Sequence, residues 1–330
     1  MNATTPPHSD EPVPGTIDNL VFYFRRNIHK VGMPLAVILL VIVFSISSEY
    51  FLTVRNFRNI GLQAAALAAV AFGQTMVVLT GGLDLSVGSV VALVSVVCAL
   101  AMSAFGIPIG ILLGLLAGAT VGLINGLVVT RFKVFPFIAT LAMLSIAAGL
   151  ALNISGGTPV AGIPREFSLL AYTRLLGVPA PLIISMALLL AVFLFLRYLR
   201  LGRDIYAVGG NPKAAHLSGI SVNRAIVTAY TLSATCAAVA AIILTARVGS
   251  GQPTLGASLP LESVAAVVLG GVSLFGGRGS VVNVAVGVAF VSVLSNGLNL
   301  LNVSSYTQMM VIGLALIMAV ALDQRFSLRS

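Results

Sequence analysis

Ten apolar runs, each close to the length of a membrane span, constrain this chain more than any other feature of its sequence. A helix needs about 20 predominantly apolar residues to cross the hydrocarbon core of a bilayer. Only 8% of the residues are charged, whereas soluble domains carry roughly 25%. The chain is therefore predicted to be an all-α, polytopic transmembrane bundle of about ten helices, at residues 33–50, 59–79, 85–105, 107–130, 134–154, 178–198, 224–246, 261–275, 281–299 and 304–322.

The basic residues predict how the bundle is oriented. With the N-terminus in the cytoplasm, 13 of the 18 Lys and Arg residues fall in inside segments and five in outside segments. Cytoplasmic loops of membrane proteins carry such an excess, so both termini are expected to be cytoplasmic. Residues 1–30 then form a cytoplasmic tail, with a disordered proline-rich start and an amphipathic lead-in over 17–30. Residues 31–330 form a single transmembrane domain.

The longest polar interruption in the second half of the chain is the loop at 200–224, which contains the signals of a short helix. Asn211 is a good N-cap, and Pro212 falls at the first helical position, where its missing N–H costs nothing. Gly219 is suited to end the helix in a left-handed conformation. A capped helix between two spans is either a docking element on the water side or a plain connector, and composition does not separate the two.

Few polar side chains fall within the spans, and each has a structural alternative to a functional role. Asp84 follows the helix-breaking pair Gly81-Gly82, and a cap for the next helix is favoured over a direct role in a path. Glu262 stands in a first helical turn, where it compensates the helix dipole. The eighth run is broken again at Gly276 and Gly277.

Amides and aromatics complete the set of candidates for the lining of a translocation path. Amides in spans more often join neighbouring helices, and aromatics near basic pairs more often anchor the chain at the membrane surface. With Asp84, the candidates for the lining of the path are Asn125, Phe135, Phe137, Thr140, Asn296 and Asn299. A faint internal repeat relates the segment at Gly81-Gly82 to that at Gly270-Gly271, as expected for a transporter built from two related halves.

Missing motifs exclude several function classes. No chain of Asp, Glu or His crosses the spans, which disfavours a proton-driven pump, and no HExxH or GxSxG motif indicates an enzyme. No GxxxxGK[ST] loop is present, so energy from ATP would have to come through another polypeptide. The distant Cys98 and Cys236 predict neither a disulfide nor a metal site. The basic residues form no patch for nucleic acid.

Five stretches carry a resemblance to a known family: TGGLDLSVGS (80–89), GLINGLVVTRFKVFPFIATLAMLSIAAGLA (122–151), RLGRDIYAVGGNPKAAHLSGI (200–220), ESVAAVVLGGVSLFGGRGS (262–280) and SNGLNLLNVSSYTQMMVIGLALIMAVALD (295–323). The chain resembles the permease subunits of bacterial ABC importers for monosaccharides, the ribose/xylose/galactose group. The resemblance implies a multi-pass permease of the bacterial inner (plasma) membrane, with a fold similar to that of vitamin B12 permeases.

The resemblance also implies partners. These are a second copy of the chain, a periplasmic sugar-binding protein, and a cytoplasmic ATPase with tandem nucleotide-binding modules that carries the ATP and Mg²⁺. The chain itself is expected to hold no cofactor. The short capped helix matches the coupling helix that docks on the ATPase, with Asn211, Pro212, Lys213, Ala214, Ala215, His216, Ser218 and Gly219 as its residues.

Two departures from the family pattern stand in this sequence. Lys213 replaces the usual Glu of the coupling loop, and Glu262 stands where the family often has Asp. Substrate choice in such systems rests mainly with the binding protein, so an importer of an autoinducer, polyol or nucleoside stays open. A facilitator that works without ATP and a non-transport membrane scaffold are the further alternatives.

Overall fold

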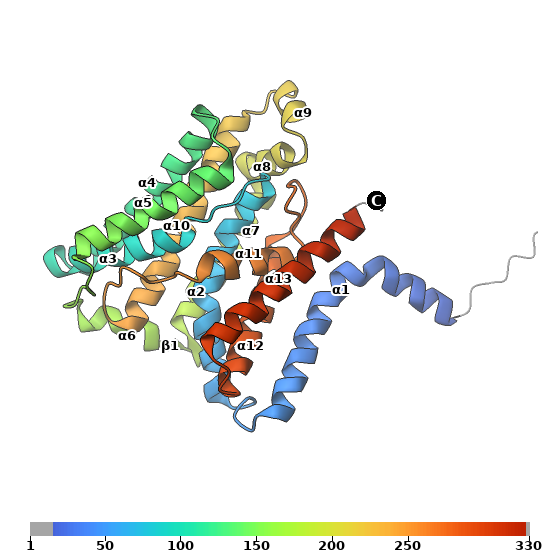
Figure 1. The fold of residues 1–330 in the computed structure, drawn as a ribbon, viewed down its shortest axis with the longest axis horizontal. Helices are drawn as coiled ribbons and strands as arrows, with labels where there is room; N and C mark the ends of the chain where they lie inside the picture. The colour runs from blue at the N-terminus through green and yellow to red at the C-terminus, as the bar shows by residue number, and fades with distance from the viewer. Residues whose placement is uncertain (1–15, 328–330) are drawn as a thin grey trace, which may run out of the picture.

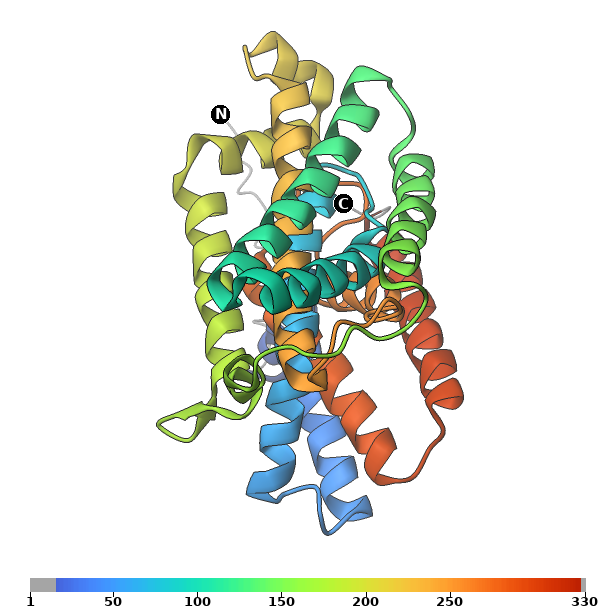
Figure 2. The ribbon, with the colours of Figure 1, turned by 90° about the vertical axis from the view of Figure 1, so that its left-hand side faces the viewer.

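Two long helices, α2 (Val54–Leu79) and α10 (Val222–Val248), pack against each other at the centre of the bundle (Figures 1 and 2). They belong to a computed structural model that describes the backbone of residues 16–327 and the side chains of 32–318, 320 and 321. Ala65–Leu79 of α2 is buried without interruption. Its small Ala and Gly side chains allow helices to contact it from every side.

Around this pair, α3 (Val87–Phe105) and α4 (Ile107–Arg131) pack against α10, and α5 (Pro136–Ser155) packs against α3. The glycines of α4 recur every fourth residue from Gly110 to Gly126 and are all buried. A Cβ added at Gly122 would overlap the backbone of α10 at Tyr230, and one at Gly126 would overlap it at Val227. Helices α4 and α10 therefore approach each other closely through small residues.

The remaining spans pack on the other side of α2, where α7 (Ala180–Tyr198), α11 (Leu259–Leu269) and α12 (Val281–Leu300) contact it. Outside them, α1 (Thr16–Ser47) packs on α12, and α13 (Ser305–Ser327) packs on α11 and α12. Two short helices, α8 (Arg200–Gly210) and α9 (Pro212–Leu217), form one end of the molecule (Figure 1). At the other end lie α6 (Arg165–Tyr172) and a hairpin of β1 (Arg174–Leu175) and β2 (Val178–Pro179).

Each of the ten predicted spans corresponds to a helix, which confirms the all-α polytopic bundle. Among the described residues, seven helices are long and apolar enough to cross a membrane: α2, α3, α4, α5, α7, α10 and α12. Three shorter apolar helices, at Gly32–Ser47 within α1, Leu259–Leu269 and Ser305–Met318 within α13, match the other three runs. The expected break in the eighth run is present, because α11 ends at Leu269.

The predicted lead-in and the first span form one helix. α1 runs from Thr16 to Ser47 with Pro34 inside it, and Figure 1 shows the helix bent. Proline in a helix interior removes a hydrogen bond and bends the axis, which accounts for a bend without a break. The expected disorder of the first residues concerns a segment, 1–15, that lies outside the described residues.

The chain leaves its helix at the two places that the faint repeat indicated, after α2 and after α11, and we call these places the two chain breaks. They share one backbone geometry. After α2, the N–H of Gly81 bonds to Val78 O (2.9 Å) and that of Gly82 to Val77 O (3.1 Å). After α11, Gly271 bonds to Val268 O (2.8 Å) and Val272 to Val267 O (3.2 Å). Gly81 and Gly271 both have positive φ, at 79° and 76°. Both helices thus end in the Schellman motif, in which glycine takes the left-handed position.

Candidate functional site

The unwound segment between α2 and α3 is fixed by a buried network that begins at Asp84. Its Oδ1 accepts hydrogen bonds from Ser86 N (3.0 Å) and Ser86 Oγ (2.6 Å). Asn125 of α4 donates from Nδ2 to Ser86 Oγ (2.9 Å). Asp84 and Ser86 are fully buried, and Asp84 Oδ2 has no partner within the described residues. Asp84 was predicted to cap the next helix; it accepts from Ser86 N, but Ser86 rather than Asp84 is the N-cap residue of α3.

Three further helices hold the same segment through its backbone. Thr140 of α5 donates to Leu83 O (3.2 Å), and Tyr230 of α10 donates to the same oxygen (3.4 Å). With its amide oriented to satisfy both groups, Gln74 of α2 pairs with the N–H and C=O of Asp84. The segment is thus bonded to α2, α4, α5 and α10 at once. A backbone that leaves its helix inside a membrane protein needs partners of this kind, because lipid supplies none.

Asp84, Asn125 and Thr140 come together in this network, and the other four path candidates do not. Phe135 and Phe137 lie at the start of α5 with 67% and 44% of their surfaces exposed. Asn296 is buried with an unpartnered Oδ1, and the exposed Asn299 accepts a hydrogen bond from Gln308 Nε2 (2.8 Å). The network members Gln74, Ser86 and Tyr230 were missed, although Gln74 and Tyr230 are polar side chains in apolar spans, the signal that identified Asn125.

The residues predicted at helix entrances take separate places. Gly81 forms the left-handed turn after α2, and Gly82 packs against the Tyr230 hydroxyl, where a Cβ would clash. Gly276 and Gly277 lie in the loop between α11 and α12 with φ of 86° and 71°. Glu262 stands in the first turn of α11, as predicted.

The predicted short helix is α9, and its ends are built as the sequence indicates. Asn211 Oδ1 accepts from Ala214 N (3.0 Å), and Pro212 occupies the first turn. Gly219 has a φ of 80°, and the N–H of Ile220 bonds to Ala215 O (3.0 Å), which completes another Schellman motif. Ala215 is the buried residue of this helix, whereas Pro212, Lys213, Ala214, His216 and Leu217 are exposed, as are Asn211, Ser218 and Gly219 beside it.

Helix α8 connects α9 to both chain breaks, and the sequence analysis did not predict it. Gly202, Ile205 and Val208 form its buried face. At its end, Gly209 lies so close to Leu79 O that a Cβ there would overlap that oxygen and Gly277 N. Gly277 N in turn donates to Leu79 O (2.9 Å). Three backbones therefore meet at Leu79, Gly209 and Gly277, and we call this contact the glycine junction.

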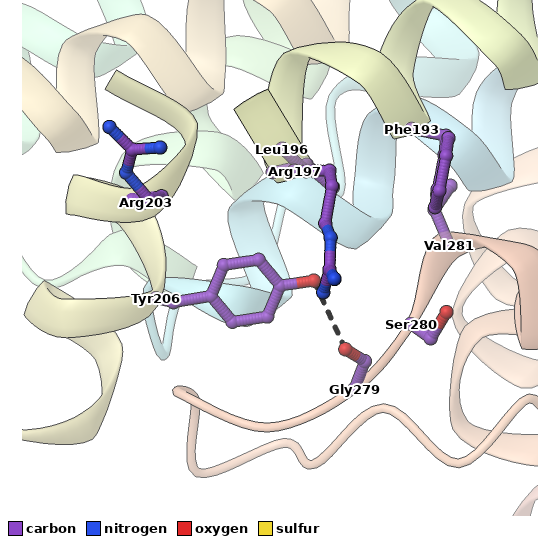
Figure 3. Close-up of a pocket in the computed structure, with 8 residues that line it drawn as sticks. All are labelled: Phe193, Leu196, Arg197, Arg203, Tyr206, Gly279, Ser280 and Val281. Carbon is purple, nitrogen blue, oxygen red and sulfur yellow. Dashed lines mark hydrogen bonds between the residues drawn. The ribbon is translucent and has the colours of Figure 1, made fainter. Parts of the chain in front are cut away.

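A cavity of about 570 Å³ lies beside the glycine junction, between α7, α8 and the start of α12 (Figure 3). Tyr206 of α8 crosses it and donates to Gly279 O (3.1 Å). Burial raises the pKa of the Tyr206 hydroxyl, so that it stays protonated as a donor. Arg197 and Arg203 also line the cavity, at the end of the molecule that carries α9. The bond from Tyr206 is a second tie between α8 and the loop before α12.

The chain is similar to known membrane proteins over most of its length. A family profile described as the permease component of branched-chain amino acid transport systems matches residues 56–320. The ribose import permease protein RbsC of Bacillus subtilis (strain 168) is 43% identical over 308 residues, which cover 92% of this chain and 96% of that protein. RbsC of Escherichia coli (strain K12) is 41% identical over 299 residues, 88% of this chain and 92% of that protein.

A relative with a different sugar in its name is similar over the same range. The L-arabinose transport system permease protein AraH of Escherichia coli (strain K12) is 38% identical over 304 residues, 92% of this chain and 93% of that protein. No solved structure matches the chain. The predicted likeness to the vitamin B12 permease fold therefore stays a prediction.

Proposed function

The chain belongs to the family of permease components that this profile describes, and on that premise we propose that it is the membrane-spanning subunit of an ATP-driven ABC importer for a monosaccharide. It is a transport component rather than an enzyme. The observation that carries the sugar assignment is the identity of about 40%, over about nine-tenths of the chain, with import permeases named for ribose and arabinose. A permease named for D-allose is 36% identical over 93% of the chain.

We propose that α9 is the helix through which a cytoplasmic ATPase drives the bundle. Its exposed face offers a docking surface, and its Asn211 cap, its Gly219 turn and the buried Ala215 hold it in place. The glycine junction supports this role, because backbone packed on backbone has no side-chain freedom to absorb a displacement. A movement of α9 would therefore be transmitted through α8 to the end of α2 and to the loop between α11 and α12.

The further partners follow from the same proposal. Permeases of ABC importers work with an ATPase and a periplasmic binding protein, in the inner membrane. We propose a homodimer, an ATPase with tandem nucleotide-binding modules that holds ATP and Mg²⁺, and cytoplasmic termini, with the binding protein at the end that carries the β1–β2 hairpin. Asp84, Asn125 and Thr140 would shape the path by fixing its wall, since they are buried. Phe135, Phe137, Asn296 and Asn299 remain candidates for contact with a solute or a second copy.

Purification in mild detergent, followed by reconstitution, tests the proposal. The chain is expected to co-purify with an ATPase, and proteoliposomes that contain both are expected to take up D-ribose, D-allose or L-arabinose only with ATP and the binding protein. Uptake of L-leucine instead would transfer the assignment to amino acids, as the wording of the family description suggests. Uptake of a polyol, a nucleoside or an autoinducer would identify a related importer. Sugar uptake without ATP would establish a facilitator and contradict the proposal.

A further inference from the structure

A second cavity, of about 420 Å³, lies away from the Asp84 network, among α2, α10, α11, α12 and α13. We call it the outer cavity. The lining residues come from the first half of α2, the last turns of α10, the loop before α11 and its first turn, the second half of α12 and the first turns of α13. The first half of α2, the last turns of α10 and the first turns of α13 lie on the side opposite α9, which is the outer side in the orientation that the basic residues favour.

The lining of the outer cavity combines apolar side chains with eight polar residues. Of its eight polar lining residues, six are uncharged: Gln63, Ser258, Ser292, Ser295, Ser305 and Gln308. The other two, Arg247 and Glu262, have opposite charges, so the lining has no net formal charge. Binding pockets combine an apolar wall with a few placed polar groups, and this cavity falls within their usual size of roughly 300–1,000 Å³.

Two of these residues have hydrogen-bonding capacity that the chain leaves unused. Ser292 is 3% exposed, and its hydroxyl has no partner within the described residues. Gln308 is held in place by its amide nitrogen, which donates to Asn299 Oδ1 (2.8 Å) and Val303 O (2.9 Å). Its oxygen is left as an acceptor of fixed position. A buried polar group without a partner costs about 1–3 kcal/mol, which a ligand that completes the bond recovers.

We propose that the outer cavity is a solute site within each protomer, where a neutral, polyhydroxylated solute of monosaccharide size is held after entry from outside. This inference rests on the proposed import of a sugar and adds its place of binding. Hydroxyl groups both donate and accept, so they match a lining of serines and amides better than a charged solute does. Ser295 and Gln308 contact the solute, Glu262 accepts from its hydroxyls, and Asn299 positions Gln308.

Thiol labelling of the Ser295→Cys permease, reconstituted with its ATPase and binding protein, tests the site. The native Cys98 and Cys236 are buried and give little background. A membrane-impermeant thiol reagent added outside is expected to modify the new thiol and to stop uptake. Saturating D-ribose, D-allose or L-arabinose, whichever the wild type imports, is expected to slow the modification about tenfold, because a bound ligand excludes the reagent.

Ser47→Cys is the control, since Ser47 is an exposed serine in the last turn of α1, outside this cavity. Its labelling should not respond to sugar, and its modification should leave uptake intact. A Ser295 thiol that is unreactive from outside, or that no imported sugar protects, would overturn the proposal. Protection by L-leucine and by no sugar would also overturn it, by showing a site for an amino acid.

A bulky substitution gives a second, independent measurement. Ser295→Phe is expected to lower sugar uptake about tenfold while ATP hydrolysis stays within about twofold of wild type, because overpacking is local to the cavity. Ser47→Phe should change neither rate. Normal uptake by Ser295→Phe would contradict the site. A wild-type complex that imports no sugar at all would instead refute the proposed function, whatever these variants do.

Discussion

The two chain breaks, at 80–86 after α2 and at 270–280 after α11, begin with the same glycine turn and are then stabilised differently. The first is enclosed: Ser86 bonds to both Asp84 and Asn125, and Thr140 and Tyr230 donate to Leu83 O. The second is rich in glycine and exposes 67% of Phe275. It contacts α8 through the backbone at Gly277 and through the hydrogen bond from the Tyr206 hydroxyl to Gly279 O.

The comparison indicates two mechanical roles for one type of turn. Side-chain hydrogen bonds fix the first break within the bundle, and close backbone contacts connect the second break to α8, which precedes the proposed coupling helix. The glycine junction joins them, because Leu79, the last residue of α2 before the first break, accepts at its carbonyl oxygen from Gly277 N of the second. Some substitutions should therefore change mainly the stability of the bundle, and others mainly the transmission of a movement from α9 to the bundle.

The largest effect is expected at the glycine junction. Gly209→Leu places side-chain atoms where Leu79 O lies, and backbone cannot move aside as a side chain can. Overpacking of this kind costs about 3 kcal/mol or more, so we expect a lower thermal unfolding midpoint and loss of uptake. Gly210→Leu is the control, because a Cβ at Gly210 meets nothing within 4 Å. If the two variants have the same unfolding midpoint and the same uptake, the proposed role of the glycine junction is wrong.

A smaller loss is expected in the first break. Asp84→Ala removes the acceptor of both Ser86 bonds and leaves buried donors unsatisfied, at a cost of about 2–3 kcal/mol. Asp84→Asn keeps an acceptor oxygen and should retain most of the stability. Thermal unfolding in detergent measures both. If alanine and asparagine prove equally destabilising, the acceptor role of Asp84 is wrong.

The second break is tested by two glycines of similar φ. Gly271→Ala and Gly277→Ala both place a side chain at positive φ, near 76° and 71°. A Cβ at Gly271 meets nothing within 4 Å, whereas one at Gly277 meets the Gly210 backbone at 2.6 Å. We expect Gly277→Ala to be less stable than Gly271→Ala by about 1 kcal/mol and to uncouple ATP hydrolysis from uptake. Identical stability and coupling would show that the contact with α8 is dispensable.

The smallest effect on stability is expected at the cap of α9. Asn211→Ala removes the bond to Ala214 N and costs about 1 kcal/mol, confined to an exposed two-turn helix. The global unfolding midpoint should hardly change, while the rate of ATP-driven uptake falls. Ser221→Ala removes the corresponding cap of α10 and serves as control. Coupling lost in Ser221→Ala and kept in Asn211→Ala would contradict the role of α9.

Much of the bundle could be predicted, because the length of a span and the cap of a helix are determined by residues that are close together in the sequence. The ten apolar runs and the Asn211–Gly219 helix are of this kind. Helix α8 was missed because its three buried residues, Gly202, Ile205 and Val208, lie among charged side chains that face away from the bundle. A Gly-Gly pair normally interrupts a helix, yet Gly209 and Gly210 both belong to α8, since close contact explains Gly209 better than backbone freedom does.

The polar contacts were less predictable, because they join residues far apart in the chain. Asp84 and Asn125 were recognised separately as polar groups in spans, but the bridge between them, Ser86, is a common residue in small-residue helices. Likewise, the serines of the outer cavity resemble the many serines that only pack helices together. Only the fold shows which of them face a cavity.

The central claim is that α9 meets the ATPase, and photo-crosslinking from two exposed leucines tests it most directly. Leu217 of α9 is 88% exposed, and Leu176, at the tip of the β1–β2 hairpin, is fully exposed at the opposite end of the molecule (Figures 1 and 2). With a photoreactive residue at each position in turn, position 217 is expected to cross-link to the ATPase and position 176 to the binding protein. Cross-linking of position 176 to the ATPase, with none from position 217, would contradict both the coupling role of α9 and the orientation of the chain.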